Sequence, residues 1–264
     1  MYVKTVSAGP KALIFDVDGT LADTERDGHR VAFNQTFADI GLDWSWSEDL
    51  YGDLLVVAGG KERLRYFLKV HQPEIPPALM PRSDSQQTDF IQKLHHLKNH
   101  YYKQRISSGK LPLRLGVRRL LQEARQSGCR LAIATTSSFE NVVALVSGSL
   151  GPDAMNWFEV IAAGDIVPAK KPAPDIYYYA LEHLKLSPQE CLVVEDSQYG
   201  LQSATAAGLP TLITVNGYTK TQGFSSARLV LSHLGEPYRP FRVIGGNAHG
   251  FSYVTTDLLP LLMP

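Results

Sequence analysis

The sequence predicts an α/β protein in which a doubly wound, parallel, Rossmann-like sheet forms the core and a helical cap domain is inserted after the first strand. Three observations support this fold class. Continuous apolar runs rich in β-branched residues recur along the chain, amphipathic helical stretches separate the later runs, and a long helix-forming stretch follows the first run. Strands buried on both faces of a parallel sheet have such runs, and strand–helix alternation favours right-handed crossovers.

Five apolar runs are the predicted strands: Lys11–Phe15, Arg130–Thr135, Phe158–Ala162, Cys191–Glu195 and Pro210–Thr214. Apolar residues at helical spacing predict the helices Gly116–Gln126, Pro174–Leu184 and Gln198–Ala207. Gly128 and Gly208 follow two of these helices, where glycine commonly ends a helix.

The long stretch after the first strand breaks this alternation. It has no comparable β run, and it is polar, helix-forming and punctuated by prolines. We therefore predict a cap domain over residues 24–105 and a core formed by residues 1–23 and 106–264. An insert at this point can cover the carboxyl end of the sheet, where open α/β sheets bind ligands. The residues after Gly217 give no clear pattern.

Composition limits the classes of function. With 264 residues, of which 44% are hydrophobic, the chain is long enough for a substantial core. Basic and acidic residues number 26 each, which argues against a nucleic-acid or polybasic membrane surface. No run is apolar for the ~18 residues of a membrane span, and the N-terminus lacks the layout of a secretory signal. Cys129 and Cys191 each open an apolar run, as buried free thiols do in a reducing compartment. We expect a monomer in the cytoplasm, or in an organelle stroma if a transit peptide has been removed, with no nucleic-acid or membrane partner.

The strongest chemical signal lies at the end of the first predicted strand, which reads Phe-Asp-Val-Asp-Gly-Thr. Asp16 and Asp18 stand two residues apart and the chain turns at Gly19, so both carboxylates can converge on one site. Two like charges this close are unfavourable unless a cation lies between them. A hard divalent cation, Mg²⁺ where phosphate is present, removes that cost. Taken alone, the pair could also be strand-end acids that cap a turn.

Three further polar clusters follow other predicted strands or open a helix. They are Thr135, Thr136 and Ser137 after the second strand, Lys171 before a proline-opened helix, and Glu195 with Asp196 after the fourth strand. Because the carboxyl ends of parallel strands share one edge, all the clusters can meet in one cleft. A metal, a nucleophile and donors to phosphoryl oxygens are what phosphoryl transfer requires. Separately, the acid pair and the hydroxyls could be ordinary helix N-terminal groups.

In order, the four clusters read DVDGT, TTSS, KPAPD and VEDS, and they resemble the four motifs of the haloacid dehalogenase (HAD)-like hydrolase superfamily. The resemblance covers Lys11–Thr24 and about Leu111–Thr214, with the spacing of members that carry a helical cap after the first motif. It implies that Asp16 is a nucleophile that forms an aspartyl-phosphate and that Asp18 is the general acid and base.

The same resemblance implies the ligands of the phosphoryl group and of the cofactor Mg²⁺. Thr135 and Lys171 would hold the phosphoryl group, and the neighbouring hydroxyls are further candidates. The implied metal site is formed by Asp16, Asp196 and the backbone carbonyl of Asp18, with Glu195 nearby.

Longer stretches narrow the resemblance. KPAPDIY and VEDSQYGLQSATAAG are similar to the β-phosphoglucomutase-like branch. DTERDGHRVAFN, YGDLLVVAGGKERL and SHLGEP more narrowly resemble the CbbY-type sugar-phosphate phosphatases. This resemblance covers the cap as well as the core. It implies a Mg²⁺-dependent phosphatase of carbon fixation that removes the 1-phosphate of xylulose 1,5-bisphosphate or a similar pentose bisphosphate.

Two other functions remain open from the sequence. A β-phosphoglucomutase-like phosphomutase on hexose phosphates would use the same active site, and the cap decides between the two. A receiver-like or phosphate-binding module could carry an aspartyl-phosphate without turnover, since doubly wound sheets host such modules. The long insert and the presence of Asp18 beside Asp16 disfavour the module.

The cap supplies four candidate substrate-binding residues. Lys61 and Arg63 follow a Gly-Gly pair, either in a loop that delivers them to a second phosphate of the substrate or at a helix start with solvated charges. His29 lies on an amphipathic helix and is equally suited to packing, exposure or contact with a sugar. Glu25 lies near the predicted hinge, which slightly favours a functional role.

Overall fold

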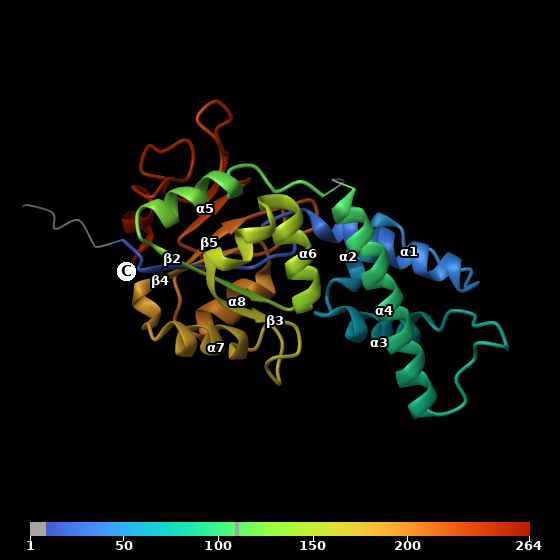
Figure 1. Cartoon of the computed structure of the whole chain (residues 1–264). Helices are drawn as coiled ribbons and strands as arrows, with labels where there is room; N and C mark the ends of the chain where they lie inside the picture. Colours follow the sequence, from blue (N-terminus) through green and yellow to red (C-terminus); the bar gives the residue numbers. More distant parts are fainter. Residues whose placement is uncertain (1–8, 109–110) are drawn as a thin grey trace, which may run out of the picture.

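A seven-stranded sheet organises the core of the protein (Figure 1). The computed structural model describes residues 9–108 and 111–264. Strand order is β3-β2-β1-β4-β5-β6-β7, and only β7 runs antiparallel to its neighbour. The strands are β1 Ala12–Phe15, β2 Arg130–Thr135, β3 Phe158–Ala163, β4 Cys191–Glu195, β5 Thr211–Thr214, β6 Leu229–Leu231 and β7 Val243–Gly246. The predicted fold class is confirmed, and all five predicted strands are present.

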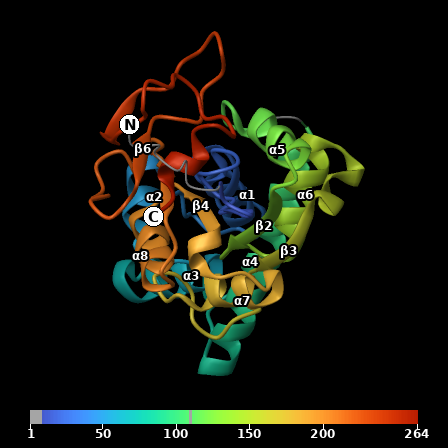
Figure 2. The ribbon, with the colours of Figure 1, turned by 90° about the vertical axis from the view of Figure 1, so that its left-hand side faces the viewer.

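Helices cover both faces of the sheet, because successive side chains of each strand point to opposite sides. Leu13 and Phe15 of β1 pack under helices α5 and α6, whereas Ala12 and Ile14 pack under α7 and α8. Figure 2 shows the two helix pairs on opposite sides of the sheet. These helices are α5 Val117–Gln126, α6 Phe139–Leu150, α7 Asp175–Leu184 and α8 Gln198–Ala206, with short 3₁₀ helices η2 Pro152–Trp157 and η3 Pro188–Glu190. The order of the strands reverses at β1, so the carboxyl ends of β1, β2 and β4 lie where such sheets bind ligands.

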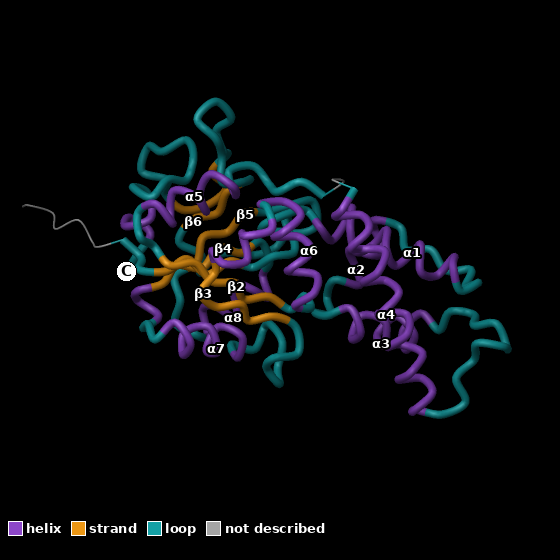
Figure 3. Tube along the Cα trace, in the orientation of Figure 1, coloured by secondary structure: helices purple, strands orange, loops and turns teal. Residues whose placement is uncertain are grey.

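The segment after β1 is helical, and residues 24–105 contain no strand among their described residues (Figure 3). Its elements are the π-helix η1 Glu25–His29 and the α-helices α1 Arg30–Asp39, α2 Glu48–Leu54, α3 Gly60–His71 and α4 Asp84–Ser107. It has a separate aromatic core in which Phe33, Phe37, Trp44, Trp46 and Phe67 pack edge-to-face or tilted. This second core is what a cap domain needs in order to keep its own shape. We retain residues 24–105 as the proposed extent of the cap, although α4 continues to Ser107.

The two connections between cap and core pair with each other. Ala22 in the first connection forms an antiparallel bridge with Leu113 in the second. Next to it, the backbone N–H of Arg114 donates to the carbonyl of Leu21 at 2.8 Å. The cap is therefore joined to the core through one small paired unit at the carboxyl edge of the sheet.

The C-terminal residues, which have no readable pattern in the sequence, complete the core. Strands β6 and β7 extend the sheet, and the 3₁₀ helix η4 (Leu259–Leu262) packs Leu259 and Leu262 into the same cluster as α5. Arg119 of α5 links this helix to the C-terminal residues, because it donates to the carbonyls of Gly235 and Val254, both at 2.7 Å. Within the described residues, no helix has both the length and the apolar character to cross a membrane.

Candidate active site

Three buried carboxylates meet at the carboxyl edge of the sheet. Asp16 follows β1, Glu195 ends β4, and Asp196 comes directly after it. Because β1 and β4 are parallel neighbours, their ends lie side by side. One oxygen from each of the three side chains lies within 4.8 Å of the others. Asp16 thus forms one cluster with Glu195 and Asp196, from which the sequence separates it by about 180 residues.

Lys171 bridges two of these carboxylates. Its ammonium lies 2.8 Å from Asp16 Oδ1 and 2.6 Å from Glu195 Oε1, and it donates to the carbonyl of Ala134 at 2.9 Å. Burial alone would lower the pKa of Lys171, but the two carboxylates raise it well above its ordinary value. The side chain therefore carries a permanent positive charge that touches the predicted nucleophile.

The cluster still holds more negative charge than this one ammonium offsets. Burial raises the pKa of Asp16 to about 7 despite its contact with Lys171, and Glu195 adds to the effect. Burial, together with the nearby charges of Glu195 and Asp16, raises the pKa of Asp196 well above its usual range. A divalent cation with oxygen ligands removes such repulsion, so the donor set and its charge fit Mg²⁺.

The side chain of Asp18 lies apart from this cluster, toward the cap. Its Oδ1 accepts a hydrogen bond from Thr24 Oγ1 at 2.5 Å and lies 3.0 Å from His29 Nε2. Burial alone would raise the pKa of Asp18, but His29 and hydrogen bonds from Thr24 and Ser137 hold it below its ordinary value. His29 is itself fixed by stacking on Tyr102, with ring centroids 4.0 Å apart. The carboxylate of Asp18 is thus held by Thr24 and His29, outside the cluster of three acids.

The predicted hydroxyl loop borders the same cavity. Thr135, at the end of β2, is buried, and its hydroxyl accepts a hydrogen bond from the backbone N–H of Ser137 at 3.2 Å. Thr135 and Thr136 line a cavity of about 450 Å³ together with Asp16, Lys171 and Asp196. The four sequence clusters therefore surround one space.

Arg63 and Glu25 from the cap reach into this region as a pair. Arg63 donates to the Tyr51 hydroxyl at 2.7 Å and lies 3.4 Å from Glu25 Oε2, to which Tyr51 also donates. Arg63 is 5% exposed, so a solvated charge at a helix start, one of the two alternatives from the sequence, is wrong for this residue. The paired side chains line the catalytic cavity from the cap side.

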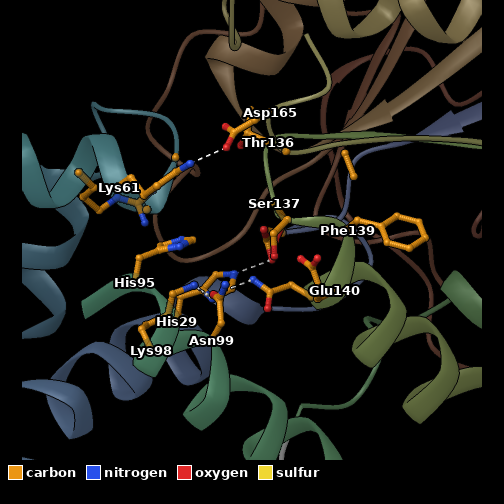
Figure 4. Close-up of a pocket in the computed structure, with 18 of the residues that line it drawn as sticks. His29, Lys61, His95, Lys98, Asn99, Thr136, Ser137, Phe139, Glu140 and Asp165 are labelled. Carbon is orange, nitrogen blue, oxygen red and sulfur yellow. Dashed lines mark hydrogen bonds and ion pairs between the residues drawn. The ribbon is translucent and has the colours of Figure 1, made fainter. Parts of the chain in front are cut away.

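A second cavity of about 390 Å³ lies between cap and core (Figure 4). Its basic lining residues are His29, Lys61, Arg63, His95, Lys98 and Lys170. Burial and the charges of Lys98 and Lys61 lower the pKa of His95 to about 3, and burial lowers the pKa of Lys98 to about 8. Cations are therefore crowded here, although Asp18, Glu25, Glu140 and Asp165 line the same cavity and balance the charges of its lysines and arginine. Ser138 Oγ and Asn141 Oδ1, both from residues that line this cavity, are buried and have no hydrogen-bond partner among the described residues.

Ion pairs close this cavity between cap and core. Lys61 Nζ lies 2.5 Å from Asp165 Oδ2, and Lys170 Nζ lies 3.0 Å from Glu62 Oε2 and 3.1 Å from Asp165 Oδ1. Figure 4 shows the pair of Lys61 and Asp165 at one side of the cavity. The structure therefore presents the cap in contact with the core over the active site.

Sequence reasoning missed several of these residues. Lys98 and His95 lie on one face of α4 at helical spacing, but a polar helix gives many such pairs and nothing in the sequence marks this one. Asn216, which donates from Nδ2 to Asp196 Oδ2 at 2.5 Å, follows β5 at the same edge as the other clusters. Its position two residues after a predicted strand was the one signal that could have identified it.

Comparisons with known proteins agree with this geometry. A family model described as haloacid dehalogenase-like hydrolase matches residues 10–208. The CbbY protein of Cupriavidus necator is 45% identical over 240 residues, covering 90% of this chain and 92% of that protein. A CBBY-like protein of Arabidopsis thaliana is 44% identical, covering 86% of this chain and 70% of its own.

Solved structures give the same result. The crystal structure of CbbY from Rhodobacter sphaeroides with phosphate has a TM-score of 0.77 and 41% identity, covering 85% of this chain and 94% of that one. A structure of a mutant of the same protein, in complex with xylulose 1,5-bisphosphate, matches equally well. The predicted resemblance, including its CbbY-type character, is confirmed. With a family model over most of its length and relatives this similar, the chain belongs to the haloacid dehalogenase-like hydrolase family.

Proposed function

We propose that this protein is a Mg²⁺-dependent sugar-phosphate phosphatase that forms an aspartyl-phosphate on Asp16. We propose further that it removes the 1-phosphate of xylulose 1,5-bisphosphate or a similar pentose bisphosphate. The observation that carries the proposal is the contact of buried Asp16 with Lys171, beside Asp196 and the Thr135 loop, in a cavity that cap residues also line. Support for the substrate comes from the related CbbY structure that holds xylulose 1,5-bisphosphate.

The proposed metal ligands are Asp16, Asp196 and the backbone carbonyl of Asp18, with Glu195 in the same cluster. When bound, Mg²⁺ would supply positive charge that lets a phosphate dianion approach a carboxylate. Both oxygens of Glu195 already accept hydrogen bonds, one from Lys171 and the other from the backbone N–H of Asp196 at 2.9 Å. Glu195 therefore also fixes the two residues on which the site depends, while its prediction as a ligand stays a prediction.

In the first step, a carboxylate oxygen of Asp16 attacks phosphorus as the bond from phosphorus to the sugar oxygen breaks. Lys171 donates toward the phosphoryl oxygens, and the hydroxyls and amides of the Thr135–Ser137 loop supply further donors. These groups are fixed by burial before substrate arrives, so little reorganisation is needed in the transition state.

Asp18 acts as the general acid and then as the general base. It protonates the departing sugar oxygen in the first step and takes a proton from the water that attacks the acyl phosphate in the second step, when the bond from phosphorus to Asp16 breaks. In the ligand-free site His29 favours the ionised form of Asp18. A phosphate dianion beside Asp18 raises its pKa by like-charge repulsion, and this favours the protonated acid that the first step requires.

The cavity between cap and core that contains Lys61, Lys98 and Lys170 is the proposed site of the second phosphate. Its lining includes Lys61, His95 and Lys98 from the cap and Lys170 from the core. It shares the lining residues Asp18, Glu25 and Arg63 with the catalytic cavity. The second phosphate of a bisphosphate that spans both cavities would lie beside Lys61, Lys98 and Lys170. This supports a pentose bisphosphate over a monophosphate.

A substrate panel with Mg²⁺ tests the proposed function. Phosphate release from xylulose 1,5-bisphosphate is expected with kcat/KM roughly 10- to 100-fold above that for pentose 1-phosphates, because charged hydrogen bonds to the second phosphate contribute ~1.5–3 kcal/mol. Pentose 5-phosphates and hexose phosphates serve as comparisons. An isomerised hexose phosphate without free phosphate would contradict the proposal in favour of a mutase, and a stable phosphoprotein without turnover would favour a receiver-like module.

Lys61→Gln tests the role of the second cavity. We expect the variant to raise KM for the bisphosphate roughly 3- to 10-fold, since one charged contact to the distal phosphate is lost. The kcat and the KM for a pentose 1-phosphate should stay near their wild-type values, since Lys61 lies outside the catalytic cavity. Lys69→Gln, at the exposed far end of the same helix, is the matched control. An equal change in KM for the bisphosphate and for the pentose 1-phosphate would mean that the distal phosphate does not bind beside Lys61.

A further inference from the structure

Arg114 lies in the second connection between cap and core, directly after the bridge that joins the two connections. Its side chain is 8% exposed and points into the core beneath the active site. Nothing in the sequence distinguishes it from the other arginines of this region. It is outside all four motifs that define the family resemblance.

The guanidinium of Arg114 has donors directed at three separate segments of the chain. It donates to the carbonyl of Gly19, after β1, and to that of Ser232, after β6, at 3.1 Å. At the end of β5 it donates to the carbonyls of Thr214 at 2.9 Å and Val215 at 2.5 Å. Its remaining donor, Nε, lies 3.2 Å from Asp23 Oδ1 in the first connection to the cap. A guanidinium offers five N–H donors in a rigid, planar arrangement, which a lysine cannot reproduce.

Two of these carbonyls belong to residues next to the ones that hold Asp196. Gly19 precedes Thr20, whose hydroxyl donates to Asp196 Oδ1 at 3.4 Å. Val215 precedes Asn216, whose amide donates to Asp196 Oδ2 at 2.5 Å. The loop at Gly19 is also packed tightly here, because a Cβ atom at that position would lie 2.4 Å from Asp196 Oδ2.

We propose that Arg114 is a positioning residue for the metal site: it holds the Gly19 and Val215 segments so that Thr20 and Asn216 fix the carboxylate of Asp196 in its binding orientation. This inference rests on the proposed function, since it assigns Asp196 as a Mg²⁺ ligand. Arg114 also ties this arrangement to Asp23 and Leu21 in the first connection to the cap. Groups that orient metal ligands typically change metal affinity by 10- to 100-fold when they are removed.

The test is Mg²⁺ binding by isothermal titration calorimetry on the full chain, without substrate, at a temperature well below thermal unfolding. Arg114→Lys, Arg114→Gln and Asn216→Ala are each expected to weaken Mg²⁺ binding by roughly 10- to 100-fold. Arg118→Gln is the matched control, because that nearby arginine is exposed and lies outside the site. Its Mg²⁺ affinity is expected to equal that of wild type.

The outcomes separate this inference from the proposed function. Wild-type affinity in folded Arg114 variants would overturn the positioning role, since a purely structural arginine lowers stability without changing the affinity of the folded state. If the Arg114 variants do not fold, Asn216→Ala decides: unchanged affinity overturns the inference and weakened affinity supports it. Absence of Mg²⁺ binding by the wild-type protein would instead overturn the proposed metal site, and this inference with it.

Discussion

Asp16→Asn is expected to lower kcat by at least about 10⁴-fold, since removal of a catalytic nucleophile has effects of this size or larger. The amide has nearly the shape of the carboxylate and can still accept the hydrogen bond from Lys171 through its oxygen. It lacks the negative charge that attacks phosphorus. The variant should therefore fold, with thermal unfolding measured alongside steady-state phosphate release from a pentose bisphosphate.

Asp27→Asn provides the control for this substitution. Asp27 lies on the cap helix η1, is partly exposed and pairs with Arg26 at the surface, so its loss should leave kcat within about twofold of wild type, as is usual for surface changes. Turnover by Asp16→Asn near the wild-type rate would remove Asp16 as the nucleophile. It would leave Asp16 as a metal ligand at most.

Lys171→Met is expected to reduce both stability and activity. Without the ammonium, Asp16 and Glu195 remain as unpaired buried acids, and breaking a buried ion pair in this way costs ~3–5 kcal/mol of unfolding free energy. The loss of a fixed donor to the phosphoryl oxygens should lower kcat by roughly 10²–10³-fold. Chemical denaturation without Mg²⁺ measures the first effect, and steady-state kinetics with Mg²⁺ measure the second.

Two further variants separate these effects. Lys170→Met removes the neighbouring lysine, whose pairs with Glu62 and Asp165 lie nearer the surface, and should cost only ~0–1 kcal/mol. The double variant Lys171→Met with Glu195→Gln removes one buried charge, so it should regain part of the lost stability but none of the activity. If Lys171→Met were as stable as Lys170→Met, the buried ion pair would not be the stabilising feature that its geometry suggests.

The sequence allowed the core of the site to be predicted because its parts are local. Each polar cluster follows a strand or opens a helix that a continuous apolar run or a proline pair makes visible. Parallel strands place their carboxyl ends at one edge, so Asp16, Thr135 and Glu195 had to converge once the strands were identified. The metal site, the aspartyl-phosphate and the monomeric state nevertheless stay predictions.

The parts of the site and fold that sequence reasoning missed depend on contacts between distant segments, which no local sequence pattern links. Lys98 contacts His29 only because α4 packs against the start of the cap. Arg114 contacts backbone carbonyls, and Asn216 contacts one carboxylate. Neither kind of contact leaves a periodic pattern in the sequence. Strand β6 is an apolar run of only three residues, and β7 is exposed and ends in two glycines, so neither stands out as the longer apolar runs do.

Trapping the phosphoenzyme tests the central claim most directly. The protein is mixed with substrate and Mg²⁺, quenched during turnover and treated with borohydride, which reduces an acyl phosphate so that the aspartate becomes homoserine, and its peptides are sequenced by mass spectrometry. We predict homoserine at position 16 and at no other aspartate, and none when substrate is omitted. Homoserine at another position, or its absence under conditions of full turnover, would contradict an aspartyl-phosphate on Asp16.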